Sequence, residues 1–282
     1  MREQTPSRTA MRVAMRRAAH QLFDAPPVLQ DPLAVRIIGA EALRRVEESR
    51  SGRNSGYART ARAFMAVRSR FAEDALAYAI ERGTAQYVVL GAGLDTFAYR
   101  SPFPGLRIFE VDHPATQTWK RRKLAAAGID APPTLTFVPV DFEREILSER
   151  LEAAGFRRDA PVFFTWLGVT MYLTEPAIES TLRFIASTAP GGGVAFDYLA
   201  PVAWRHLRTR VGVWWLKRKV AAAGEPFKTS LAPRRLHDRL SALGFHSIVD
   251  LGCDEINATY FAGRADGLAV RGTAGRLLSA RR

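Results

Sequence analysis

The sequence predicts an α/β fold built on a doubly wound parallel sheet, and two observations lead to this prediction. First, short apolar segments alternate with helical patterns of about 10–15 residues through the middle of the 282-residue chain, which is typical of parallel strands joined by helices. Second, a Gly-x-Gly turn directly follows the first of these segments, and acidic residues follow the next two. Because sheets of this type bind ligands at the carboxyl ends of their strands, we expect the functional site at that edge.

The first 82 residues precede this alternation and predict a helical region. Residues 11–23 carry apolar side chains at helical spacing. Asp31 and Pro32 predict the N-cap and the first position of a second helix. Further helical patterns cover residues 41–51 and 57–82. We therefore expect residues 1–82 to form a helical region and lid, separate from the alternating part of the chain.

The sheet and its helices are predicted from residue 83 onward. Five segments have the short apolar composition of buried strands, namely residues 87–90, 107–111, 134–140, 161–165 and 193–198. Helical patterns between them cover residues 115–127 and 175–187. We expect residues 83–200 to form the ligand-binding core of the doubly wound fold.

The rest of the chain departs from this pattern. Residues 201–230 interrupt the alternation and hold three tryptophans, which are Trp204, Trp214 and Trp215. This composition predicts a helical cap insertion over the sheet. Residues 231–282 are expected to complete the core, with a helix at 231–243 and an antiparallel edge formed by residues 247–251 and 258–262.

Composition excludes several classes of site. The only cysteine, Cys253, excludes an internal disulfide and a cysteine-based zinc site. The five histidines lack the spacing of a metal-binding pair, so we expect no metal site. The single cysteine favours a reducing, cytoplasmic setting. No apolar segment reaches the ~20 residues that span a bilayer, so we expect no membrane partner. The formal charge of +13 would suit nucleic acid, but the basic residues are spread along the chain, which favours a small-molecule partner and leaves the oligomeric state open.

The turn after the first predicted strand is the strongest local signal for a ligand. Gly91, Ala92 and Gly93 allow close approach to the backbone. Thr96 stands where a dinucleotide-binding fingerprint has its third glycine, which argues against a pyrophosphate and therefore against NAD. Asp112 follows the second predicted strand and could accept hydrogen bonds from ribose hydroxyls. Alternatively, Asp112 caps the helix that follows it.

The third predicted strand ends in Asp141 and Phe142. The Asp141 carboxylate could accept a hydrogen bond from an adenine amino group, and Phe142 could offer its backbone N–H or its ring face. At the third strand end of this topology, these two residues indicate an adenosine-like ligand.

A set of motifs resembles the bacterial branch of the leucine carboxyl methyltransferase family, which includes polyketide carboxyl methyltransferases. The matching segments are Ser7-Arg8-Thr9-Ala10, Arg17-Ala18, Asp31-Pro32-Leu33-Ala34, Arg68-Ser69-Arg70-Phe71, Gly91-Ala92-Gly93-Leu94-Asp95-Thr96, Glu110-Val111-Asp112-His113-Pro114, Val140-Asp141-Phe142 and Trp166-Leu167-Gly168-Val169-Thr170-Met171-Tyr172-Leu173. The resemblance implies a class I methyltransferase fold and an enzyme that uses S-adenosylmethionine as methyl donor. S-adenosylhomocysteine would be the product.

The resemblance also implies roles for individual residues. Arg68 would bind the methionine carboxylate of the donor, because a guanidinium group matches a carboxylate with two parallel hydrogen bonds. Without the resemblance, a salt bridge of Arg68 with Glu73 or Asp74 is the alternative. The turn glycines would surround the donor, and the next two strand ends would hold its ribose and adenine. The full set of implied cofactor-binding residues is Arg68, Gly91, Ala92, Gly93, Asp112, His113, Asp141, Phe142 and Trp166.

The methyl acceptor is less well defined. In the branch of the family that methylates proteins, an acidic residue stands where this chain has Leu167, which argues against a protein C-terminal leucine as substrate. A carboxylate acceptor needs no base, so positioning would supply most of the rate. A phenol or alcohol needs a base, for which His20 and His206 are candidates, and Tyr172 and Asp197 could line the acceptor pocket. We expect O-methylation of a small, polyketide-like molecule. The alternatives are a protein or RNA methyltransferase and a catalytically silent nucleoside-binding protein.

Overall fold

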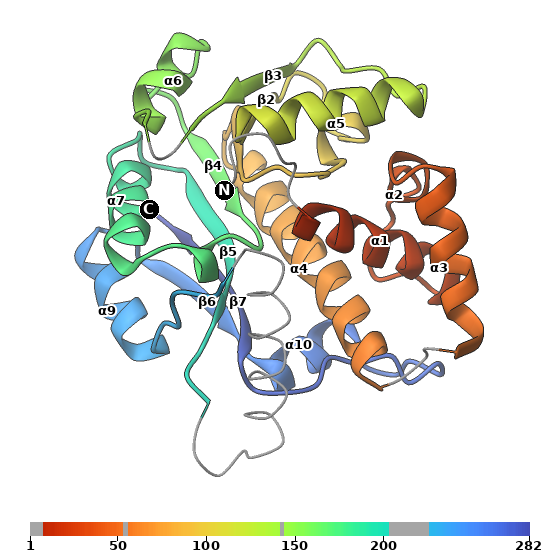
Figure 1. The fold of residues 1–282 in the computed structure, drawn as a ribbon. Helices are drawn as coiled ribbons and strands as arrows, with labels where there is room; N and C mark the ends of the chain where they lie inside the picture. The colour runs from red at the N-terminus through yellow and green to blue at the C-terminus, as the bar shows by residue number, and fades with distance from the viewer. Residues whose placement is uncertain (1–7, 53–55, 142–143, 203–225) are drawn as a thin grey trace.

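The computed structural model describes residues 8–52, 56–141, 144–202 and 226–282, and its centre is a seven-stranded sheet (Figure 1). The strand order is β3-β2-β1-β4-β5-β7-β6. The strands are β1 (Gln86–Leu90), β2 (Arg107–Asp112), β3 (Leu135–Pro139), β4 (Val162–Trp166), β5 (Gly193–Leu199), β6 (Ser247–Leu251) and β7 (Gly275–Arg281). The first five strands are parallel, whereas β7 is antiparallel to both β5 and β6. The strand order reverses between β1 and β4, which confirms the doubly wound fold.

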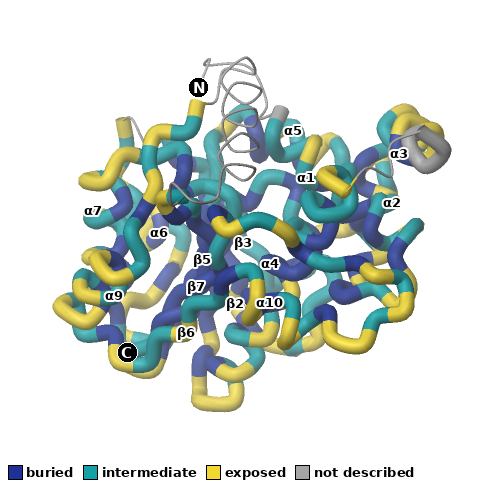
Figure 2. Tube along the Cα trace, turned by 90° about the horizontal axis from the view of Figure 1, so that it is seen from below, coloured by how far each residue is buried: buried dark blue, intermediate teal, exposed yellow. Residues whose placement is uncertain are grey.

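Helices cover both faces of the sheet (Figure 1), and the residues buried between them lie mainly in the strands (Figure 2). One face packs against α6 (Leu147–Ala153), α7 (Glu175–Ala186) and α9 (Pro233–Ala242). The other face packs against α4 (Gly56–Ile80) and α10 (Cys253–Tyr260). Because neither face meets water, β1 and β4 are buried along their whole length. This burial explains why their sequences are apolar runs without alternation.

The N-terminal region consists of α1 (Arg8–Phe23), α2 (Leu33–Ile37) and α3 (Ala40–Gly52). These helices form a separate hydrophobic cluster with α5 (Pro114–Ala126), and α1 also contacts α4. The first turn of α1 lies against the turn that follows β1, because a Cβ atom on Gly93 would lie 3.2 Å from Ala10 Cβ. The N-terminal helices therefore reach the carboxyl edge of the sheet, where the functional site is expected.

One expected strand is wrong. Residues 258–262 were expected to pair with residues 247–251, but they follow the start of α10, and β6 pairs with β7 instead. The Glu255 side chain stabilises the beginning of α10 by accepting a hydrogen bond from the Gly252 backbone N–H at 2.9 Å. A short apolar run does not by itself distinguish a strand from a buried helical turn. The strand that was overlooked is β7, which lies between β5 and β6 and carries Arg276 and Arg281 near its two ends.

Of the predicted cap, residues 201–202 and 226–230 are described. Residues 203–225, which include the three tryptophans and His206, lie outside the described residues. The described segment that follows runs beside η2 (Thr170–Tyr172), since Lys228 N donates to Met171 O at 2.8 Å. Within the part of the chain that the structure describes, no helix combines the length and the apolar composition needed to cross a membrane.

A buried ion pair joins β2 to α5. Lys120 Nζ donates to Glu110 Oε2 at 2.6 Å, and both side chains are 1% exposed. Burial raises the pKa of the Glu110 carboxyl to about 7, although the neighbouring Lys120 ammonium opposes this shift. The pair therefore keeps a charge in the core that would be costly without its partner.

We predict that Lys120→Met destabilises the fold by about 3–5 kcal/mol, because it leaves the buried Glu110 carboxylate unpaired. Since burial raises the pKa of Glu110 in the folded state, a neutral carboxyl is favoured at low pH, and the loss of stability should grow as pH rises from 5 to 9. Urea unfolding measures the effect. The double variant Glu110→Gln/Lys120→Met should be more stable than Lys120→Met at pH 8, and equal stability of the two variants would contradict this account.

Candidate functional site

The turn after β1 adopts a backbone conformation that requires glycine. Gly91 has φ +72, and a Cβ atom there would lie 2.5 Å from Val169 Cγ2. The backbone N–H groups of Gly91 and Ala92 both donate to Val111 O, at 2.8 and 3.0 Å. The turn is thus tied to the end of β2, and it contacts the loop after β4. A side chain at position 91 would be excluded by both conformation and space.

Asp112, at the end of β2, binds the glycine turn. Its carboxylate accepts hydrogen bonds from Gly93 N at 2.6 Å and from His113 N at 2.7 Å. Burial raises the pKa of Asp112, while these two backbone N–H groups oppose the shift. The following helix is capped by His113, whose Nδ1 accepts from Ala115 N at 3.2 Å. The alternative that Asp112 is the helix cap is therefore wrong.

Asp141 lies at the next strand end along the sheet. Val140 N donates to Asp112 O at 2.9 Å, which holds the end of β3 beside the end of β2. Asp141 N donates to Glu145 Oε2 at 2.8 Å, and its carboxylate forms an ion pair with Arg144 at 3.7 Å. Phe142 lies outside the described residues. The glycine turn, Asp112 and Asp141 thus occupy three adjacent strand ends.

Arg68 reaches the opposite side of the turn from α4. Its Nη1 donates to Asp197 Oδ2 at 3.1 Å, and the side chain is 8% exposed. Asp197, in β5, also accepts from Gly168 N at 2.5 Å. A Cβ atom on Gly168, which has φ +73, would lie 2.9 Å from Arg68 Nη1. This glycine in the loop after β4 therefore leaves the space that the guanidinium group occupies.

The expected alternative partners of Arg68 are bound elsewhere. Glu73 pairs with Arg100, and Asp74 pairs with Arg70 at 2.7 Å. Within the described residues, the buried Nε of Arg68 has no hydrogen-bond partner. Arg68 therefore has donor capacity left at the sheet edge, although one nitrogen is committed to Asp197.

The two sides of the turn differ in chemistry. Asp112 and Asp141 supply acceptors at the ends of β2 and β3, which suits hydroxyl and amino donors of a ligand. Arg68 supplies a guanidinium group at the ends of β4 and β5, which suits a carboxylate. The reversal of strand order lies between these two sides, where ligands bind in open α/β sheets.

The histidine candidate His20 is held within a buried network. Its side chain is fully buried, its Nε2 accepts from Val28 N at 2.9 Å, and its Nδ1 lies 2.8 Å from Asp24 Oδ2. A ring nitrogen that accepts an N–H carries no proton, so Nδ1 carries the proton that is donated to Asp24. Both nitrogens are occupied, and this geometry favours a structural histidine over a catalytic base.

Two further candidates lie near the end of β4. The Trp166 side chain is 3% exposed, and its ring packs in the core, 6.4 Å from the Phe196 ring. The Tyr172 ring is half-buried and lies 5.3 Å from the Phe227 ring. Tyr172 therefore lies where the last residues of the predicted cap meet the sheet edge. Among the described residues, no group of three or more His, Cys, Asp or Glu side chains is placed to hold a metal ion.

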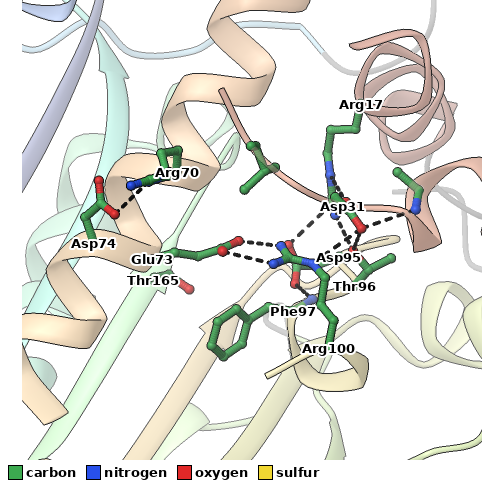
Figure 3. A network of polar contacts seen from close by, with 12 residues as sticks. Arg17, Asp31, Arg70, Glu73, Asp74, Asp95, Thr96, Phe97, Arg100 and Thr165 are labelled. Carbon is green, nitrogen blue, oxygen red and sulfur yellow. Dashed lines mark hydrogen bonds and ion pairs between the residues drawn. The ribbon is translucent and has the colours of Figure 1, made fainter. Parts of the chain in front are cut away.

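Sequence reasoning missed a buried polar network on the far side of the glycine turn (Figure 3). Arg17 and Asp31 both bind the Thr96 hydroxyl, at 2.5 and 2.7 Å. Thr96 was interpreted only as the absence of a third glycine, whereas its side chain is the centre of these contacts. The available signal was that Arg17 and Asp31 stand in two matching motifs to which no role in the site was assigned, Asp31 being expected only to cap a helix.

Comparison with known proteins shows the family to which the chain belongs. The profile of the leucine carboxyl methyltransferase family matches residues 10–186, which include Arg68, the glycine turn, Asp112 and Asp141. YktD of Bacillus subtilis, a proposed S-adenosyl-L-methionine-dependent methyltransferase, is 35% identical over 207 residues, covering 72% of this chain and 68% of that protein. A protein of Parafrankia sp. that carries the same functional description is 35% identical over 199 residues, covering 67% of this chain and 62% of its own length.

Solved structures share the fold. A proposed methyltransferase of Thermobifida fusca has a TM-score of 0.58 at 18% identity, covering 92% of this chain and 99% of that chain. A DUF574 family protein of Streptomyces avermitilis has a TM-score of 0.54 at 17% identity, with coverages of 95% and 96%. The fold, the enzyme class and the methyl donor expected from the sequence are thus confirmed. The chain belongs to the leucine carboxyl methyltransferase family and is an S-adenosylmethionine-dependent methyltransferase.

Proposed function

We propose that this enzyme transfers the methyl group of S-adenosylmethionine to a carboxylate oxygen of a small molecule. The observation that carries the proposal is the chemical difference between the two sides of the glycine turn. Carboxylates lie at the ends of β2 and β3, and the Arg68 guanidinium group lies at the ends of β4 and β5. A nucleoside joined to an amino acid presents the complementary groups in the same order.

On this proposal, each side of the site holds one part of the methyl donor. Asp112 accepts the ribose hydroxyls through lone pairs that its two backbone contacts leave available. Asp141 and Phe142 contact the adenine, while Gly91, Ala92 and Gly93 let the ligand approach the backbone. When bound, the donor supplies a methyl group that its sulfonium has already activated.

Arg68 is proposed to bind the amino-acid carboxylate of the donor. Its link to Asp197 fixes the guanidinium plane, and its buried Nε has no partner among the described residues. A buried donor without a partner is destabilising, and a ligand carboxylate would satisfy it. Trp166 and His113 then act indirectly, since the Trp166 ring supports the end of β4 from the core and His113 caps α5.

A carboxylate acceptor is favoured by the state of the described histidines. His20 and His113 each use a ring nitrogen to accept a backbone N–H. His237 contacts Asp250 at 2.8 Å on the distant β6 edge, and His246 is exposed just before that strand. A phenol must lose its proton to a base, whereas a carboxylic acid is already ionised near neutral pH. Positioning of the acceptor close to the methyl group would then supply most of the rate.

The N-terminal helices are proposed to limit access to this site. Ala10 in α1 packs on Gly93, so the helical region of residues 1–82 borders the donor side of the site. Residues 171–173 bind Lys228 and Thr229, at the end of the predicted cap. On this proposal the acceptor enters between these two regions, and Tyr172 is placed to contact it.

The proposed function predicts that label from [methyl-³H]S-adenosylmethionine is transferred to carboxylic acids and is released by mild base. A panel of hydrophobic carboxylic acids, with the matching phenols and amines as controls, is incubated with the enzyme and donor. Methyl esters release volatile labelled methanol on alkaline treatment, whereas aryl methyl ethers and methylamines retain the label. Base-stable label on phenols or amines alone would contradict a carboxylate acceptor.

The donor site predicts that Asp112→Ala weakens S-adenosylhomocysteine binding by at least about tenfold, because two ribose hydroxyls lose a charged acceptor and such bonds contribute about 1.5–3 kcal/mol each. Isothermal titration calorimetry measures the affinity, with circular dichroism as the check on folding. Asp159→Ala is a matched control, since Asp159 is an exposed aspartate whose ion pair within the described residues is with Arg157. Unchanged affinity of a folded Asp112→Ala variant would contradict the ribose role.

A further inference from the structure

The side of the glycine turn that faces away from β2 is held by three buried side chains, which we call the Thr96 cluster: Arg17, Asp31 and Thr96. The Thr96 hydroxyl donates to Asp31 Oδ1 at 2.7 Å and accepts from Arg17 Nη2 at 2.5 Å. Arg17 Nε also donates to Asp31 Oδ2 at 3.0 Å. Figure 3 shows these three side chains pointing toward one another from α1, the segment before α2 and the end of the turn.

The Thr96 cluster also contacts the turn directly. Arg17 Nη1 lies 3.5 Å from Leu94 O and 3.4 Å from Asp95 Oδ2. Asp95 Oδ1 in turn accepts from Phe97 N at 2.8 Å. One arginine of α1 thus contacts three consecutive residues of the turn, through a backbone carbonyl, a carboxylate and a hydroxyl group.

The Thr96 cluster contains two charged side chains and is almost completely buried. Asp31 and Thr96 are 0% exposed, and Arg17 is 4% exposed. Although burial opposes ionisation, the Arg17 and Arg100 charges hold the pKa of Asp31 below its ordinary value. Arg100 is itself held by Glu73 of α4 and lies 3.4 Å from Asp31. In such surroundings hydrogen bonds are strong and a missing partner is costly, so the groups are fixed in position.

The turn is therefore held at both ends. Asp112 binds Gly93 N on the β2 side, and the Thr96 cluster binds residues 94–96 on the α1 side. These attachments hold Gly93 and the residues directly after it, and residues 91–93 are the backbone proposed to meet the methyl donor. Fixing it in advance removes an ordering cost from ligand binding.

We infer that Arg17, Asp31 and Thr96 are positioning residues for the methyl donor, which they affect by holding the glycine turn without touching the ligand. This inference rests on the proposed placement of the donor at that turn. It gives the N-terminal helices a part in donor binding in addition to any role toward the acceptor. It also replaces the interpretation of Thr96 as a lost glycine with a function for its hydroxyl group.

The chain contains a matched control for a purely structural role. Arg62 of α4 binds Asp24 just after α1 through two hydrogen bonds of 2.8 Å each, and both side chains are less than 10% exposed. This second pair also joins the N-terminal helices to the rest of the fold. Asp24 also contacts His20. None of the hydrogen bonds described for Arg62 and Asp24 reaches residues 91–96.

The test compares Thr96→Val, Thr96→Ser, Arg17→Gln and Arg62→Gln by calorimetry with S-adenosylhomocysteine and by thermal unfolding. Thr96→Val keeps the size of the side chain and removes the hydroxyl, so we expect at least about fivefold weaker binding. Thr96→Ser, which restores the hydroxyl, should bind within twofold of wild type. Arg62→Gln should lower the melting temperature as Arg17→Gln does, yet bind within twofold of wild type. If Arg17→Gln does not fold, the affinities of Thr96→Val and Thr96→Ser alone test the positioning role.

Two results would overturn the inference. One is a folded Thr96→Val variant whose affinity is unchanged, and the other is a loss of affinity in Arg62→Gln as large as that in Thr96→Val. Wild-type protein that fails to bind S-adenosylhomocysteine would instead contradict the proposed function itself. Normal wild-type binding together with unchanged Thr96→Val binding would contradict only the positioning role.

Discussion

The turn between β1 and Thr96 is the constraint on which the rest of the structure depends. On the proposed function, residues 91–93 expose their backbone to the donor, and Gly, Ala and Gly do not hold a conformation by themselves. The conformation is supplied from outside the turn. Val111 and Asp112 bind its first half, and Arg17 binds its second half. The surrounding helices and strands thus fix a turn whose first three residues are Gly, Ala and Gly.

This requirement explains why so much charge is buried near the carboxyl edge of the sheet. Arg17 with Asp31, Arg68 with Asp197 and Lys120 with Glu110 are all nearly inaccessible pairs. Buried ion pairs are weak evidence for stability, because desolvation offsets much of their attraction. Each pair joins two different elements: Arg17 links α1 to the segment before α2, Arg68 links α4 to β5, and Lys120 links α5 to β2. Such pairs define orientation more sharply than apolar contacts do, which suits a site whose rate depends on positioning.

The sequence predicts the parallel strands well because their signal is local. Runs such as 87–90 are apolar, short and bounded by turn residues, and each matches an observed strand to within a few residues. The same local reading places Gly91, Asp112 and Asp141 at adjacent strand ends. It fails for the edge of the sheet, where β7 pairs with β6 across an intervening helix and carries arginines at its ends.

The sequence indicated which residues lie at neighbouring strand ends, but it did not indicate the side-chain partners of Arg68 and Thr96. The alternative considered for Arg68 was an acid on its own helix, but its side chain binds Asp197, 129 residues away in β5. Thr96 binds Asp31, 65 residues away, and Arg17, 79 residues away. No periodicity in the chain encodes these contacts, because they arise only when α1 and α4 pack at the carboxyl edge. The family resemblance showed that Arg17, Asp31, Arg68 and Thr96 stand in matching motifs. The structure shows which side chains each of them contacts.

The most direct test of this account is a crystal structure of the protein with S-adenosylhomocysteine. The account predicts ribose hydroxyls within about 3 Å of the Asp112 carboxylate and the ligand carboxylate at the same distance from the Arg68 guanidinium group. Residues 93–96 should keep their contacts with Asp112, Arg17 and Asp31. A ligand bound in the reverse direction, or away from the β1–β4 reversal with Arg68 contacting Asp197 alone, would contradict it.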